Sequence, residues 1–107
     1  MKIIETNIKD ALLAEISGEL NSVDLLKASL EVIKEKNKDI HAYLEVFDDA
    51  KIDGANKAKV GKALYGIPIA IKDNILIEGK ISTASSPILE NHKAIYDATV
   101  IKKLKEA

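Results

Sequence analysis

The fold is decided by an apolar stretch near the middle of the chain, Leu64-Tyr65-Gly66-Ile67-Pro68-Ile69-Ala70-Ile71, which runs directly into Lys72-Asp73-Asn74. The stretch is apolar on both faces, a pattern typical of a strand buried in a sheet that is covered on both sides. Pro68 cannot donate a hydrogen bond to a ladder, so we expect it at the start or the edge of the strand. The pattern predicts an α/β fold.

Two amphipathic helices are predicted before this stretch. The first runs from about Asn7 to Ser17, with Thr6 as its cap and Gly18 at its C-terminal end. The second runs from about Ser22 to Asn37 and is capped by Asn21 or Ser22. Apolar residues recur at helical spacing in both, at Ile8, Leu12, Leu13 and Ile16 and at Val23, Leu26, Leu30 and Ile33.

The other segments complete the predicted outline. We expect a short strand over His41–Phe47, a weaker helix over residues 48–59 and an irregular connection over residues 79–91. A last helix is capped by Asp97, with an inner face made of Val100, Ile101 and Leu104. Because these elements cannot complete an α/β sheet, we expect the front part of a longer fold. Residues 1–60 would form a helical segment and residues 61–107 the start of an α/β core.

Composition excludes several classes of protein. The 107 residues suit one domain or part of one, and the absence of cysteine excludes disulfides and thiol catalysis. All 16 basic residues are lysine and the net charge is −1, which argues against a dedicated nucleic-acid reader. No apolar run is long enough for a membrane span and no signal peptide is recognisable, so we expect a cytoplasmic protein with no membrane partner.

Lys72 is chemically the most distinctive residue, because it directly follows the predicted buried strand. Ligands of open α/β sheets bind beyond the carboxyl ends of strands. A lysine desolvated in a closed site can lose its proton and act as a general base. The alternative is a strand-end lysine that reaches bulk water or pairs with Asp73. Position alone favours this alternative.

Other candidate groups are weaker. His41 and His92 lie far apart in sequence without a ligand cluster, so we expect no metal site. Solvated surfaces are the simpler interpretation of two charged groups, Asp48-Asp49 with Asp53, and Lys57, Lys59 and Lys62. The hydroxyls of Thr83-Ala84-Ser85-Ser86 indicate a polar turn. No phosphate-binding glycine loop and no G-x-S-x-G elbow occurs.

The segment from Gly66 to Asn74 resembles the opening motif of the amidase signature family. The resemblance continues through three later segments and two N-terminal ones, which are Thr83–Ser86, Leu89–Asn91, Tyr96–Val100, Gly18–Leu20 and Ser22–Leu25. It covers essentially the whole chain but only the front part of the family's domain. Within the family, the residues look closest to the A subunits of glutamyl-tRNA(Gln)/aspartyl-tRNA(Asn) amidotransferases.

The resemblance implies an α/β fold with a mixed central sheet, of which this chain holds the N-terminal helices and the first strands. It implies a Ser–cis-Ser–Lys triad with Lys72 as the catalytic base. An A subunit would hydrolyse glutamine and pass ammonia to a B subunit, which amidates an aminoacyl-tRNA, while a C subunit clamps the complex. ATP and Mg²⁺ would be used in that partner subunit and tRNA bound by the complex, and this chain would bind no cofactor or metal.

The chain departs from the family pattern at one point, because nothing in it matches the Gly/Ser-rich segment that carries both serines. Ser82, Ser85 and Ser86 belong to a different stretch and are not candidate nucleophiles. We therefore expect the isolated chain to be inactive. Two alternatives stay open: a non-catalytic module that docks onto partner subunits through its N-terminal helices, and the front part of another amidase acting on small or lipid amides.

Overall fold

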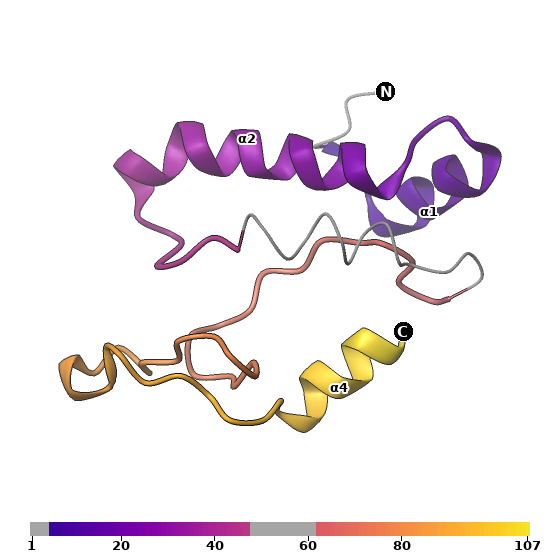
Figure 1. Ribbon diagram of the computed structural model, residues 1–107. Helices are drawn as coiled ribbons and strands as arrows, with labels where there is room; N and C mark the ends of the chain where they lie inside the picture. Colours follow the sequence, from indigo (N-terminus) through magenta and orange to yellow (C-terminus); the bar gives the residue numbers. More distant parts are fainter. Residues whose placement is uncertain (1–4, 48–61) are drawn as a thin grey trace. The chain divides into compact units, whose positions relative to one another are not determined.

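The computed structural model describes residues 5–47 and 62–107. The chain divides into two compact units, residues 1–68 and 69–107, and each is considered by itself. The elements are α1 (Ile8–Ser17), α2 (Ser22–Ile40), the short 3-10 helix η2 (Pro87–Leu89) and α4 (Thr99–Glu106) (Figure 1). The helix predicted over residues 48–59 lies outside the described residues.

Helix α1 begins and ends with a cap. The side chain of Asn7 accepts a hydrogen bond from the backbone N–H of Asp10 at 2.9 Å, so the cap is Asn7 and the prediction of Thr6 was wrong. Gly18 ends the helix in the left-handed conformation with φ +79° and donates to the carbonyl of Glu15, as its position predicted.

Helix α2 is longer than predicted. Its cap is Asn21, whose side chain accepts from the backbone N–H of Asp24 at 2.9 Å. The helix continues past Asn37 to Ile40 and ends at His41, which adopts the left-handed conformation with φ 54°. The Asn37 side chain then bonds both backbone groups of Tyr43, donating to its carbonyl at 2.9 Å and accepting from its N–H at 2.8 Å. These bonds fasten the chain that follows the helix.

The two predicted strands, over residues 41–47 and 64–71, are not strands in this structure. Extended pairing within the described ranges is limited to an isolated antiparallel bridge between Ile81 and Lys93. Asn37 already occupies the backbone groups of Tyr43. Turns bend the start of the apolar stretch, where Tyr65 donates to Lys62 and Ile67 to Leu64. A strand is stabilised by a neighbouring strand, and none lies beside these segments in the described part of the chain.

Small residues form much of the core of the first unit, where α1 meets the first turns of α2 (Figure 1). Its buried cluster is Ala11, Ala14, Leu20 and Leu25, with Ile67 packed against it. The apolar stripe predicted for α1 was largely wrong, because Ile8, Leu13 and Ile16 are exposed. The alanines face the other elements instead, since small side chains let backbones approach closely.

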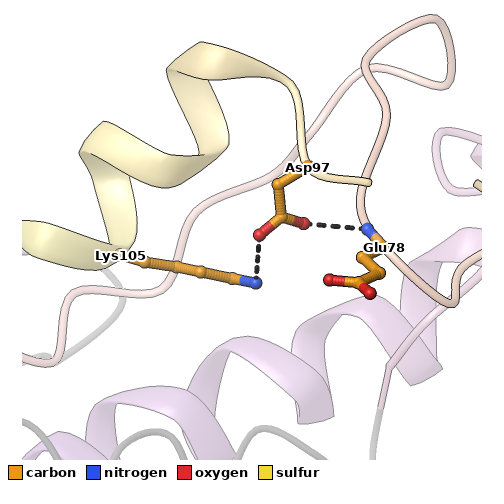
Figure 2. Close-up of polar contacts among 3 residues, drawn as sticks. All are labelled: Glu78, Asp97 and Lys105. Atoms are coloured by element: carbon orange, nitrogen blue, oxygen red, sulfur yellow. Dashed lines mark hydrogen bonds and ion pairs between the residues drawn. The ribbon is translucent and has the colours of Figure 1, made fainter. Parts of the chain in front are cut away.

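The second unit has a different organisation. Ala94 and Ile101 are its buried apolar residues, and the inner face predicted for α4 is only partly confirmed, because Val100 is exposed. Asp97 does not cap α4, which was the prediction; the capping position is Ala98, with no side-chain hydrogen bond. The Asp97 carboxylate instead accepts from the backbone N–H of Glu78 at 2.8 Å and from the amine of Lys105 at 2.7 Å (Figure 2).

Candidate functional site

Lys72 lies where an extended segment gives way to a turn. The turn is closed by the backbone N–H of Ile75, which donates to the carbonyl of Lys72 at 3.0 Å. The Lys72 side chain is exposed, and within the described ranges its amine forms no hydrogen bond or ion pair. The described residues therefore provide neither the enclosure expected around a neutral lysine nor the alternative pairing with Asp73.

The carboxylate of Asp73, the next residue, is held by a distant loop. Its Oδ1 atom accepts from the backbone N–H of Thr83 at 3.1 Å. Its Oδ2 atom accepts from the Thr83 hydroxyl and, at 3.4 Å, from the backbone N–H of Ser85. These donors, the Thr83 hydroxyl foremost, hold the pKa of Asp73 below its usual range. Asp73 is therefore an anion at neutral pH whose charge is met by hydrogen bonds.

The backbone carbonyl of Asp73 is held by the same loop. The hydroxyl of Ser82 donates to it at 2.6 Å, and the backbone N–H of Ala84 donates at 3.3 Å. Ser82 is buried, and its N–H donates to the carbonyl of His92 at 3.0 Å. The residue that follows Lys72 is thus fastened through both its side chain and its main chain.

The loop that bonds Asp73 contains two residues with a left-handed backbone conformation. Ala84 and Ser85 both have positive φ, at 47° and 60°. Side chains with a Cβ atom rarely adopt this conformation, so surrounding contacts must hold it. The hydrogen bonds to Asp73 and the bond from Ser85 N–H to the Thr83 hydroxyl at 3.0 Å supply them.

The other sequence candidates do not gather into a second site. His41 and His92 are both exposed, and among the residues that the structure describes no three His, Asp or Glu side chains cluster as metal ligands would. Lys62 is exposed. The remaining candidates lie outside the described residues, namely Asp48, Asp49, Asp53, Lys57 and Lys59.

Sequence reasoning missed the link between Asp73 and the loop. It placed the hydroxyls of residues 83–86 in a polar turn, which is where they lie, but gave them no partner. A usable signal was present, because aspartate and threonine are the residues that bond backbone groups in turns. Nothing local in the sequence pairs residue 73 with residue 83, however.

Comparison with known proteins places the chain in a family. Residues 24–107 match the sequence model of the family described as Amidase, so the chain belongs to the amidase family. The family that the segment from Gly66 to Asn74 predicted is thereby confirmed.

Several relatives are similar over most of this chain. It is 39% identical to the A subunit of glutamyl-tRNA(Gln) amidotransferase from Endomicrobium trichonymphae, over 99% of this chain and 23% of that protein. It is 50% identical to the protein of the same name from Lactobacillus gasseri, over 84% of this chain and 19% of that protein. It is 44% identical to the protein of the same name from Lactobacillus acidophilus, over 100% of this chain and 22% of that protein. The chain thus spans about a fifth of the length of these relatives.

A helix that crosses a membrane must be both long and largely apolar. Among the described residues, no helix combines these two properties.

Proposed function

We propose that residues 1–107 form the N-terminal part of the A subunit of a tRNA-dependent amidotransferase, the subunit that hydrolyses glutamine. The observation that carries this proposal is the similarity to the Lactobacillus acidophilus A subunit. The alignment covers all 107 residues of this chain, and 44% of them are identical. The position of Lys72 supports it, since the lysine directly precedes a residue that many hydrogen bonds fasten. A fastened turn suits a group that must be placed accurately.

Lys72 would act as the general base of the complete subunit. Its neutral amine would take a proton that a bridging serine relays from an attacking serine. The serine oxygen would form an ester with the side-chain carbonyl carbon of glutamine, and the amide nitrogen would leave as ammonia. Water would then hydrolyse the ester to glutamate and restore the serine. Both serines belong to the Gly/Ser-rich segment that this chain lacks, so the isolated chain would be inactive.

The complete protein would supply what this chain lacks. We propose that residues 1–60 are a helical segment and that residues 61–107 begin an α/β core whose mixed sheet forms with the rest of the domain. Ammonia would pass to a B subunit, which uses ATP and Mg²⁺ to activate Glu-tRNA(Gln) or Asp-tRNA(Asn), and a C subunit would clamp the assembly. The complex would bind tRNA in the cytoplasm, without membrane contact.

A chimera tests this function. Residues 1–107 replace the matching segment of the Lactobacillus acidophilus protein, which is then combined with that organism's own partner subunits. We expect glutamine-dependent conversion of Glu-tRNA(Gln) to Gln-tRNA(Gln), measured beside conversion driven by free ammonia. Glutamine hydrolysis without transfer to tRNA would instead indicate another amidase of the family. Assembly of the complex without any hydrolysis would indicate a non-catalytic docking module, a role that the exposed Ile8, Leu13 and Ile16 of α1 would suit.

A further inference from the structure

We propose that Asp73 is a positioning residue for Lys72, and that Thr83 keeps the Asp73 carboxylate turned away from the lysine. The inference rests on the proposed function, because it concerns how the base of that reaction is held. All the contacts that support it lie within residues 69–107, which form one compact unit.

The backbone is constrained on the C-terminal side of Lys72. Lys72 and Asp73 share a peptide bond, and Asp73 is bonded at its carbonyl by Ser82 and Ala84 and at its carboxylate by Thr83 and Ser85. The backbone N–H of Ile75 donates to the carbonyl of Lys72, which belongs to that same peptide bond, at 3.0 Å. The position of Lys72 is therefore linked to the segment that follows it in the chain.

The Asp73 carboxylate is the nearest anion in sequence to the Lys72 amine. Such a carboxylate can pair with the amine, and the pair favours the protonated lysine. A base must instead give up its proton before it can accept another. The Thr83 hydroxyl and N–H occupy both oxygens of Asp73, and no ion pair between Asp73 and Lys72 forms in the described part of the chain. Among the described residues, the amine of Lys72 thus has no counter-ion.

The loop that holds Asp73 adopts a costly backbone. Ala84 and Ser85 have left-handed φ values of 47° and 60°, a conformation that costs free energy for residues with a side chain. That conformation turns the N–H groups of residues 83, 84 and 85 toward Asp73. The two residues are the central pair of a turn in which the N–H of Ser86 donates to the carbonyl of Thr83 at 2.8 Å.

The test compares two substitutions at one position in the chimeric protein. Thr83→Val keeps the shape of the side chain but removes the hydroxyl, whereas Thr83→Ser keeps the hydroxyl. We expect Thr83→Val to lower kcat for glutamine hydrolysis by about tenfold to 100-fold with little change in KM. It should also move the pH of half-maximal kcat upward, because a carboxylate left with only the backbone N–H donors of residues 83 and 85 pairs more readily with protonated Lys72. Thr83→Ser should restore both values.

Ser86→Ala is the matched control, since it removes a hydroxyl from the same loop that makes no capping hydrogen bond. A purely structural role for Thr83 would reduce the amount of folded enzyme, but it would leave kcat per active site and the pH midpoint unchanged. That result would overturn the inference. Lys72→Ala in the same chimera separates the two claims. If Lys72→Ala keeps normal turnover, the proposed function itself fails; if it abolishes turnover while Thr83→Val behaves like the unsubstituted chimera, only the inference about Asp73 fails.

Discussion

A buried acidic side chain is the least expected residue of the first unit. Glu15 is only 8% exposed and Ser22 only 4%, and neither the Glu15 carboxyl oxygens nor the Ser22 hydroxyl has a hydrogen-bond partner in the described part of the chain. Burial raises the pKa of the Glu15 carboxyl. Charged carboxylates are costly to bury without partners. Glu15 therefore opposes folding once it is ionised.

The pH dependence of this effect has a definite sign. Because the folded pKa of Glu15 is raised above 4.5, its unfavourable effect is absent below pH 4.5 and is complete once the pH exceeds the folded value. We expect Glu15→Gln to raise the free energy of unfolding at pH 8 more than at pH 4, measured by urea denaturation of the chain. The control is Glu19→Gln at an exposed position of the same unit. An equal effect of Glu15→Gln at both pH values would contradict this account.

Gly66 lies beside the same pair and tolerates no side chain. Its φ is +63°, and a Cβ atom there would overlap the side chain of Ser22 and lie 3.5 Å from a carboxyl oxygen of Glu15. Gly79 has a similar φ of +77° with open space around it. We expect Gly79→Ala to cost its own unit about 1–2 kcal/mol from backbone conformation alone. Gly66→Ala should cost clearly more, read from hydrogen exchange of nearby amides, and equal losses would show that the overlap with Ser22 does not matter.

At the scale of elements, features that depend on neighbouring residues in the sequence were predictable. Features that depend on contact with a distant segment were not. Asn21 and Gly18 cap their helices as expected, because a cap depends on residues within one turn. The strands failed because strand formation depends on a neighbour that the local sequence does not contain. Residues 64–71 carry a pattern suited to burial on both faces, yet Ile69 is 46% exposed in this chain. The prediction that the apolar stripe of α1 is buried was wrong for a related reason. The spacing of apolar residues indicates a helix, but it does not show which face of the helix packs against a neighbouring element.

Asp97, which was predicted to cap α4, instead links two segments of the second unit. The carboxylate joins the turn at Glu78 to the far end of α4 through Lys105 (Figure 2). The Lys105 amine and then the Glu78 N–H hold the pKa of Asp97 below its usual value of 3.8. Its stabilising effect should therefore be present above pH 3.8 and be lost as the pH falls through the folded pKa.

Two substitutions separate the contributions to this link. Asp97→Ala removes both the hydrogen bond from the Glu78 N–H and the ion pair with Lys105. Lys105→Ala removes only the ion pair, and the Lys105 side chain is 61% exposed. We expect the amides of residues 78–80 to exchange much faster in Asp97→Ala than in Lys105→Ala, because an exposed ion pair contributes little. The difference should shrink in acid. If Lys105→Ala were the more damaging change, the ion pair and not the bond to Glu78 would hold the turn.

At the scale of the whole molecule, the described residues bury little apolar surface. No large side chain among them is fully buried, and Ile88, Ile95 and Leu44 are 93%, 82% and 74% exposed. This agrees with a chain that spans about a fifth of the length of its relatives. Lys72 could be singled out from sequence, because it lies within a recognisable motif, Gly66–Asn74. The enclosure expected around its amine is not formed by the described residues, because Lys72 is exposed among them.

The most direct measurement of the central claim is the rate of ammonia release from glutamine by the chimeric protein with and without the Lys72 amine. We expect Lys72→Ala to lower kcat by at least about 100-fold while circular dichroism and the unfolding midpoint stay unchanged. Lys93→Ala, at another exposed lysine of the same unit, should leave kcat within about twofold. A folded Lys72→Ala chimera that releases ammonia as fast as the Lys93→Ala chimera would contradict the assignment of Lys72 as the base.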